Sequence, residues 1–303
     1  MVRYFLGCVL ALLFVSCSSD VAEPEPTLTE YYDLAYGTSS TRQQLDIFLP
    51  TSGTAPYPVV LLIHGGSWEG GNRSTFYDSP SLNGLLEQGF AVVPVGYRLS
   101  GEAVYPAQIH DIKGAIRYLR ANAGTYSLDT SRMGAWGFSA GAHLAVLAAT
   151  SGDAASLEGT VGPAGPSSRL QAVADWFGPV DLLTAQAQVV AQGCPPAEDL
   201  NGPDSPITRL LGFQPQTNPT AAAQANPITF LTANDPPMLI AHGLQDCTVP
   251  FAQSQQLYDS SQVRQGPTAT QLLLYANSGH GSGVFATQAA LDAVVQFLAE
   301  QLQ

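Results

Sequence analysis

Short apolar runs alternate with amphipathic segments along the chain after about residue 40. Many of the apolar runs are continuous, which is typical of strands buried on both faces of a parallel sheet. The pattern predicts an initial antiparallel pair and six further strands, over residues 30–36, 44–49, 59–63, 90–96, 132–136, 171–177, 238–242 and 271–275. Helices are predicted over residues 81–88, 107–122, 140–150, 252–260 and 284–302. This order predicts an α/β protein, with a mostly parallel sheet and helices on both faces.

The stretch of residues 178–235, between the sixth and seventh predicted strands, is too long for a simple connection. It is rich in Ala, Gln, Pro, Asn and Thr, and one short helix is predicted over residues 182–191. We interpret it as an insertion in a single domain that spans residues 30–303. It either roofs a site as a cap or is a surface excursion unrelated to substrate, and the sequence leaves both open.

A serine between two glycines stands where a predicted strand turns into a predicted helix. The residues are Gly137-Phe138-Ser139-Ala140-Gly141. Such a sharp turn forces its central residue into strained backbone geometry, and the flanking glycines let the neighbouring strand and helix approach closely. The pattern predicts that Ser139 is a nucleophile; the alternative is a glycine-rich turn with an incidental serine.

A serine nucleophile needs an imidazole to take its proton and a carboxylate to orient that imidazole. His280 lies in a glycine-flanked loop after the last predicted strand and is the predicted base, and Asp246, shortly after the seventh strand, is the predicted acid. The order serine, aspartate, histidine along the chain is that of the α/β-hydrolases.

The other histidines and acids are weaker candidates for these two roles. We expect His143 to form a local hydrogen bond and His242 to be a packing residue at a turn, while His64 belongs to a different motif and His110 lies early in a helix. Among the acids, Asp235 falls at the wrong edge of the sheet, and Asp175 and Asp181 are the remaining competitors.

A glycine loop, His64-Gly65-Gly66-Ser67-Trp68, directly follows the third predicted strand. Attack on an ester carbonyl creates an oxyanion, which backbone amides of such a loop can bind together with the amide of the residue after the nucleophile. The candidate donors are the amides of Gly65, Gly66, Ser67 and Ala140. Which two of the three loop amides face the oxyanion stays open, and the alternative is a tight loop that only directs the chain.

These motifs resemble the esterase branch of the α/β-hydrolases that carries an HGG-x-W motif. That branch includes hormone-sensitive-lipase-like carboxylesterases, bacterial feruloyl- and acetyl-esterases and kynurenine-formamidase-like enzymes. The similarity continues through Tyr105-Pro106-Ala107, Gly178-Pro179-Val180-Asp181-Leu182 and Asp246-Cys247-Thr248-Val249-Pro250. One departure is Ser67, which stands where lipase-like members often have a third glycine.

The resemblance implies an α/β-hydrolase fold and a serine carboxylesterase that works through an acyl-enzyme and needs no cofactor. An amide or peptide hydrolase on the same triad, formamidase-like activity included, is the first alternative. The second is a non-catalytic lipoprotein that uses the hydrolase scaffold to bind carbohydrate or a partner.

Charge and composition narrow the choice of substrate. The net charge is −13, with 11 Lys and Arg and no basic run, so nucleic acid is excluded as a partner. Neutral or lightly charged esters, as small molecules or linked to a polymer, suit such a surface. Trp68, Phe138 and Trp176 either line the substrate pocket or belong to the core. No metal-ligand spacing is present, and the oligomeric state stays open.

The first residues predict export. Arg3 precedes an apolar stretch, residues 4–15, that is too short for a transmembrane helix. Together with Ser16-Cys17-Ser18-Ser19, this stretch resembles a bacterial lipoprotein signal, although Phe14 stands where leucine is usual. The resemblance implies a signal peptide over residues 1–16, a lipid on Cys17, a tether over residues 17–29 and attachment to the cell envelope, the outer membrane favoured by Ser18. The alternative is an ordinary signal peptide and a secreted or periplasmic protein.

Export leaves two cysteines available to pair. Of the four, Cys8 lies in the predicted signal peptide and Cys17 would carry the lipid, so Cys194 and Cys247 remain. An oxidising compartment would allow them to form a disulfide. The alternative is a pair of buried thiols.

Overall fold

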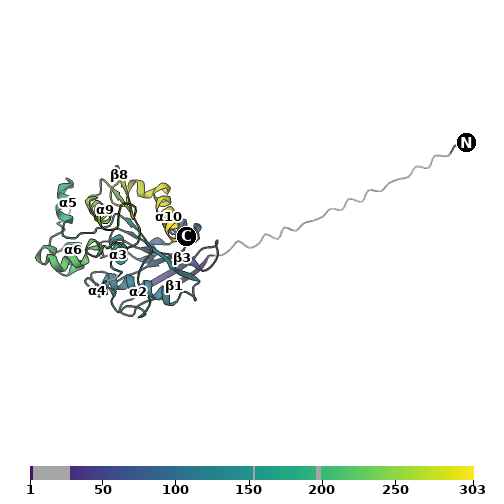
Figure 1. Ribbon diagram of the computed structural model, residues 1–303, viewed down its shortest axis with the longest axis horizontal. Coiled ribbons are helices and arrows are strands. Elements are labelled where there is room, and N and C mark those ends of the chain that lie inside the picture. The colour runs from purple at the N-terminus through teal and green to yellow at the C-terminus, as the bar shows by residue number, and fades with distance from the viewer. Residues whose placement is uncertain (3–27, 153, 196–198) are drawn as a thin grey trace.

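The computed structural model describes residues 1–2, 28–152, 154–195 and 199–303 (Figure 1). Residues 3–16 of the predicted signal peptide, the predicted lipid attachment site Cys17 and residues 17–27 of the predicted tether lie outside the described residues. Within the described part of the chain, every helix is too short or too polar to cross a bilayer.

The described residues form an eight-stranded sheet in the order β1-β2-β4-β3-β5-β6-β7-β8. The strands β1 and β2 and the pair β2 and β4 are antiparallel, and the pairs from β4 to β8 are parallel. Their bounds are β1 Thr29–Ala35, β2 Gln44–Leu49, β3 Tyr57–Ile63, β4 Ala91–Val95, β5 Leu128–Phe138, β6 Ala172–Trp176, β7 Met238–Gly243 and β8 Thr270–Tyr275. This confirms the predicted fold class, and only β5 begins well before its predicted start.

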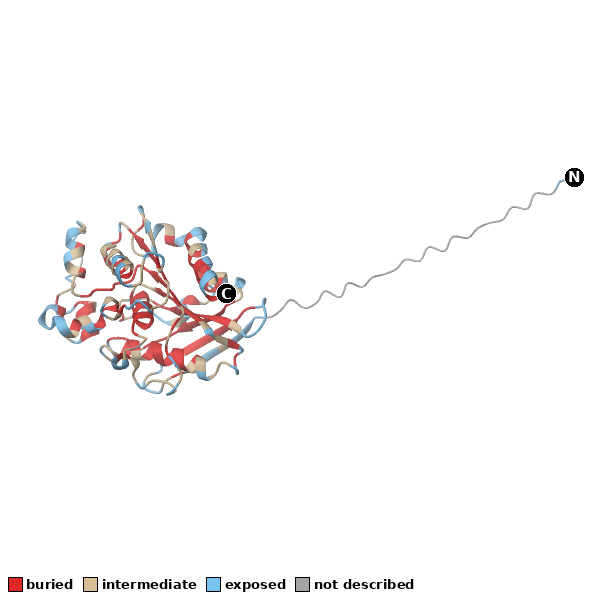
Figure 2. Ribbon diagram, viewed as in Figure 1, coloured by how far each residue is buried: buried red, intermediate tan, exposed pale blue. Residues whose placement is uncertain are grey.

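Helices cover the sheet on both faces, and the strands at its centre are buried (Figure 2). Along these strands, alternate residues face opposite cores. On one face Val59, Leu61 and Ile63 of β3 belong to the core under α2 (Ala107–Ala121), α3 (Ala140–Thr150) and α9 (Ala252–Arg264). On the other face Val60 and Leu62 belong to the core under α1 (Pro80–Glu87) and α10 (Gln288–Leu302). Helix α10 begins four residues later than predicted, because a 3₁₀ turn, η4 (Gly283–Ala286), precedes it.

The insertion between β6 and β7 holds more short helices than the one that was predicted. They are α5 (Ala185–Ala191), α6 (Pro206–Leu211), η2 (Pro215–Thr217), α7 (Pro219–Ala222), η3 (Ala223–Ala225) and α8 (Pro227–Phe230). Local signals set α6: Ser205 caps it through its hydroxyl, and Gly212 ends it with a φ of 80°. In Figure 1, α5 and α6 lie on the side of the molecule opposite β1. Two further short elements, η1 (Arg73–Phe76) and α4 (Ala155–Glu158), complete the described chain.

Candidate active site

Ser139 stands at the turn between β5 and α3, with a φ of 55° that non-glycine residues seldom adopt. The flanking glycines explain how this turn fits. A Cβ on Gly141 would lie 2.1 Å from the carbonyl oxygen of Ile63, and a Cβ on Gly137 would lie 2.3 Å from that of Gly141. Only glycines therefore let β3 and α3 approach the turn this closely, and the serine is left at the carboxyl edge of the sheet.

Three side chains from three separate loops meet at this edge. The Oγ of Ser139 is 2.9 Å from Nε2 of His280, and Nδ1 of His280 is 2.7 Å from Oδ2 of Asp246. An ionised carboxylate can only accept, so Nδ1 carries a proton and donates it to Asp246. Nε2 is then unprotonated and accepts a hydrogen bond from the hydroxyl of Ser139. The structure thus brings together the three residues that were selected from the sequence.

Asp246 is buried and held by hydrogen bonds on both oxygens. Its Oδ1 accepts from the amides of Thr248 and Val249, each at 2.9 Å. Burial by itself raises the pKa of Asp246, but hydrogen bonds from His242 and His280 outweigh it and lower the pKa to about 2. The carboxylate therefore stays ionised at neutral pH.

Two other histidines have different contacts from those predicted. His143 does not bond locally: its Nδ1 accepts from the indole N–H of Trp68 at 3.2 Å, and its Nε2 donates to the carbonyl of Ala225 at 2.8 Å. Every residue of α3 is buried, so a polar side chain there must find partners on the segments packed against it. His242 is more than a packing residue, because its Nε2 lies 3.3 Å from Oδ2 of Asp246.

The competing acids lie in other environments. Asp175 is buried in β6, where its Oδ1 accepts from the amide of Gly178 at 2.8 Å and its Oδ2 has no partner within the described residues. Burial raises the pKa of Asp175 to about 7, although the Gly178 hydrogen bond and the charge of His242 oppose the rise. Asp181 accepts from Asn226 and Gln256, and Asp235 accepts from Thr232. In residues 1–2, 28–152, 154–195 and 199–303, no cluster of three or more His, Cys, Asp or Glu is placed to hold a metal ion.

The glycine loop after β3 folds against the serine turn. A Cβ on Gly65 would lie 2.7 Å from the carbonyl oxygen of Phe138, so Gly65 packs directly on the turn. Gly66, Ser67 and Trp68 all have positive φ, at 114°, 55° and 59°. Ser67 and Ala140 line the cavity beside Ser139.

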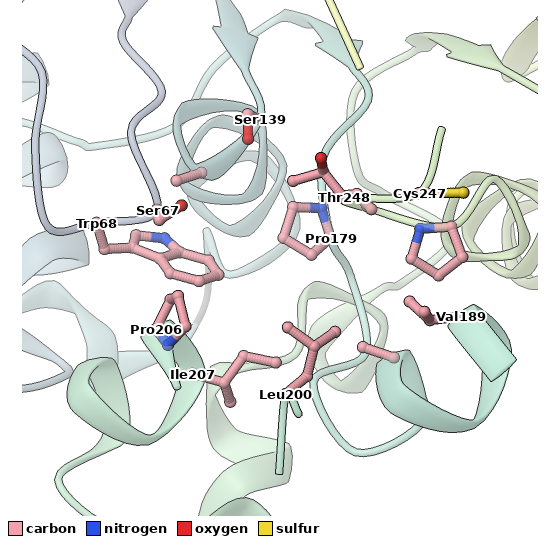
Figure 3. Close-up of a pocket in the computed structure, with 14 residues that line it drawn as sticks. Ser67, Trp68, Ser139, Pro179, Val189, Leu200, Pro206, Ile207, Cys247 and Thr248 are labelled. Carbon is pink, nitrogen blue, oxygen red and sulfur yellow. The ribbon is translucent and has the colours of Figure 1, made fainter. Parts of the chain in front are cut away.

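A cavity of about 150 Å³ opens beside Ser139 (Figure 3). The insertion supplies one wall, in which Figure 3 places Leu200, Pro206 and Ile207 across the cavity from Ser139 and Val189 near Cys247. The insertion also contributes Pro179 and Ala185, and the rest of the lining consists of Ser67, Trp68, Ala140 and residues 247–250. Most of these side chains are apolar, so the cavity suits an uncharged group.

Of the three aromatic residues proposed for the pocket, only Trp68 lines this cavity. Phe138 and Trp176 instead pack together, with ring centroids 5.3 Å apart, on the sheet face that α10 covers. Trp176 also contacts Phe285, at 5.0 Å between centroids. The prediction for Phe138 and Trp176 is therefore corrected: strand alternation sends both rings into that core, beside Trp136.

A disulfide joins the insertion to the loop that carries Asp246. It links Cys194 to Cys247 as predicted, with 5.5 Å between the Cα atoms. Gln192, which sequence reasoning missed, supports the same junction. Its side-chain amide donates to the carbonyl of Asp246 at 2.6 Å and accepts from the amide of Phe251 at 3.2 Å. The only signal for Gln192 in the sequence is its nearness to Cys194.

Comparisons with known proteins follow this geometry. Residues 45–260 match the family model described as BD-FAE. The chain is 30% identical over 279 residues to the probable carboxylic ester hydrolase LipM and 31% identical over 278 residues to the esterase LipQ, both of Mycobacterium tuberculosis. Each alignment covers 88% of this chain but only 60% and 61% of those relatives, so the chain spans about 60% of their length.

Two solved structures are similar over most of this chain. A truncated form of a carbohydrate esterase from gut microbiota is 32% identical with a TM-score of 0.81, and the match covers 92% of this chain and 98% of that one. A bifunctional GH43-CE protein of Bacteroides eggerthii is 35% identical with a TM-score of 0.79, and the match covers 90% of this chain and 38% of that one.

Proposed function

Because the chain belongs to the BD-FAE family of α/β-hydrolases, we propose that it is a serine carboxylesterase that hydrolyses neutral carboxylic esters through an acyl-enzyme. The observation that carries the proposal is the unbroken series of hydrogen bonds from Ser139 through His280 to Asp246, at the edge of an apolar cavity. A series of this kind supplies a nucleophile, a base and a group that fixes the base's tautomer.

In the proposed acylation step, Oγ of Ser139 attacks the ester carbonyl carbon while its proton passes to Nε2 of His280. The resulting imidazolium is stabilised by the ionised Asp246, and the tetrahedral oxyanion accepts hydrogen bonds from backbone amides. The amides of Ala140 and Ser67 are the proposed donors, since both residues line the cavity beside Ser139. His280 then protonates the alkoxide oxygen of the leaving group, so the C–O bond breaks and an alcohol departs.

Deacylation repeats these steps with water as the nucleophile. His280 takes a proton from a water molecule as its oxygen attacks the acyl carbon, and then returns a proton to Oγ of Ser139 as the acid leaves. The low pKa of Asp246, about 2, keeps its negative charge opposite the imidazolium in both halves of the reaction.

The size and polarity of the cavity support short acyl groups. An apolar cavity of about 150 Å³ admits a molecule of the size of benzene, so we propose acyl chains of up to about six carbons. The similar carbohydrate esterase, matched over almost its full length, supports sugar-linked esters as one class of substrate.

Nitrophenyl esters of acetate, butyrate and octanoate, tested with the full chain, check this proposal. We expect higher kcat/KM for the two shorter esters, and a Ser139→Ala variant with kcat lowered about 10⁴-fold or more. The melting temperature should change little, because within the described residues the hydrogen bond of the serine hydroxyl goes to His280 alone.

Other outcomes would redirect the assignment. Turnover by Ser139→Ala near the parent rate would exclude this serine as the nucleophile. Hydrolysis of formamides in preference to esters would indicate the formamidase-like alternative, and carbohydrate binding without any turnover would indicate a binding protein.

We also propose that the protein is exported and lipid-anchored through Cys17. The Cys194–Cys247 disulfide supports an oxidising compartment, and the residues around Cys17 resemble a lipoprotein signal. Labelled palmitate should enter the protein expressed in a Gram-negative host and should not enter a Cys17→Ser variant. Release of the unlabelled parent protein from the cells would instead indicate an ordinary signal peptide.

A further inference from the structure

We propose that His242 is a positioning residue for catalysis, because it holds the same carboxylate oxygen of Asp246 that pairs with His280. The inference rests on the function proposed above. It concerns a second imidazole, which is not part of the triad and contacts Asp246.

His242 lies near the end of β7 and is completely buried. Its Nε2 is 2.8 Å from the carbonyl oxygen of Val249 and 3.3 Å from Oδ2 of Asp246. A carbonyl oxygen can only accept a hydrogen bond, so Nε2 must carry a proton. That N–H is therefore shared between the carbonyl and the carboxylate, both of which belong to the loop after β7.

The other ring nitrogen fixes the orientation of the imidazole. Nδ1 of His242 lies 2.6 Å from Oγ of Ser254 on α9. With the proton on Nε2, a neutral ring accepts at Nδ1 from the hydroxyl of Ser254. The ring is thus held from two elements, the loop after β7 and helix α9, and its Nε2–H binds the carbonyl of Val249 with Oδ2 of Asp246 3.3 Å from the same nitrogen.

Asp246 consequently has donors on both oxygens. Oδ1 accepts hydrogen bonds from the amides of Thr248 and Val249. Oδ2 accepts from Nδ1 of His280 and lies 3.3 Å from Nε2 of His242. The two amides come from the loop of Asp246 itself and move with it. His242 is the donor that ties Oδ2 to β7, and so to the sheet. When His280 becomes an imidazolium, this contact opposes rotation of the carboxylate away from the orientation that aligns Nδ1.

Among the described residues, few ionisable groups interact with His242. Asp246, which also pairs with His280, lies on the side of Nε2, and Asp175 on the neighbouring strand β6 interacts with His242 electrostatically. Ser254 on α9 is neutral. Loss of the His242 donor leaves Asp246 a stronger base, which stabilises the imidazolium form of His280. The acid limb of the kcat/KM profile should then move to higher pH.

Two substitutions in the full chain separate positioning from packing. His242→Leu removes the donor, whereas His242→Gln keeps an amide N–H that can reach the place of Nε2. We expect His242→Leu to lower kcat about tenfold or more and to leave KM within about twofold of the parent value. The acid limb of its kcat/KM profile should lie at higher pH than that of the parent. His242→Gln should recover most of kcat. The low-field proton resonance of His280 Nδ1–H should shift in His242→Leu and stay near its parent position in His242→Gln.

A folded His242→Leu protein with parent kcat would overturn the proposal. Equal loss of kcat in both variants, with the His280 resonance unmoved, would also overturn it, because His242 would then act through packing alone. If His242→Leu does not fold, Ser254→Ala decides: it removes the partner of Nδ1 and should shift the His280 resonance, and no shift would refute the inference. The resonance is read in the resting protein without substrate, so it tests His242 even if the parent chain hydrolyses no ester and the proposed function fails.

Discussion

The serine turn and the insertion form opposite walls of one cavity, yet they are held in place by different means. At the serine turn, backbone packs on backbone: Cβ atoms on Gly141, Gly137 and Gly65 would lie only 2.1, 2.3 and 2.7 Å from carbonyl oxygens. The insertion is held by side chains instead, through the disulfide and through glutamines. Buried Gln253, for example, accepts from the amides of Val180 and Asp181 at 2.7 and 2.8 Å. The serine turn therefore has almost no freedom to shift, whereas the wall of the cavity that the insertion forms depends on bonds that can be removed singly.

The largest expected effect comes from adding one methyl group at the serine turn. Gly141→Ala would place a Cβ 2.1 Å from the carbonyl oxygen of Ile63, so either β3 or α3 must move. We expect a loss of stability of about 4 kcal/mol or more and no measurable turnover, checked by thermal unfolding and ester hydrolysis. Gly101→Ala is the matched control, since a Cβ there would meet nothing within 4 Å. Parent-like turnover by Gly141→Ala would show that the turn is not tightly constrained.

Breaking the disulfide should have the next largest effect. A double Cys194→Ala, Cys247→Ala variant releases a loop with a separation of 53 residues, which costs about 4 kcal/mol in the loop-entropy model. We expect the melting temperature to fall by about 5 to 10 °C. We also expect kcat for a small ester to fall several-fold with little change in KM, because the Asp246–His280 alignment loosens.

Thiol titration of denatured, unreduced protein shows first whether the bond is present. Two free thiols in protein recovered from an oxidising compartment would refute it. A bond that is present, but whose removal changes neither melting nor kcat, would mean that the glutamine hydrogen bonds hold the insertion without it.

The same contrast explains what the sequence could and could not predict. The serine turn and the eight strands were predictable because their signals are local: Gly137 and Gly141 flank Ser139 within five residues, and the apolar runs mark the strands. Contacts across the insertion were not, because His143 pairs with Ala225 and Gln192 with Asp246, residues 82 and 54 positions away. No periodic pattern marks α6 to α8 either, since short capped turns bury too few residues to show one.

A smaller effect is expected on the pH dependence of stability, through Asp175 on β6. The pKa of buried Asp175 is about 7 in the folded state against about 3.9 in an unfolded chain. For an acid with a raised folded pKa, stability falls as pH rises from about 4 to 7, because the unfolded state ionises first. Asp175→Asn keeps an acceptor for the Gly178 amide and should be more stable than the parent by about 2 kcal/mol at pH 8.

Urea unfolding at two pH values checks this linkage. The gain from Asp175→Asn should shrink to about 0.5 kcal/mol or less at pH 4, where the folded parent carries a protonated Asp175 and about half of the unfolded chains do. A gain of equal size at pH 4 and pH 8 would contradict it, because the effect would then come from packing and not from ionisation.

The smallest expected effect is on specificity, at the wall itself. Val189 on α5 lines the cavity, so Val189→Phe should narrow it. We expect kcat/KM for the butyrate ester to fall about fivefold while that for the acetate ester stays near the parent value, measured side by side. Val190→Phe is the control, because Val190 is 66% exposed and does not line the cavity. Equal losses for both esters would place the acyl group elsewhere.

The disulfide also restricts how this scaffold can be altered. Cys247 is both a lining residue of the cavity and the immediate neighbour of Asp246, and Cys194 anchors the insertion to it. A transplanted insertion that changes chain-length preference must therefore bring its own cysteine and an equivalent of Gln192. Without them, the graft would change the lining of the cavity and also loosen the loop that carries Asp246, so the proposed substrate range and the proposed turnover could not be altered independently.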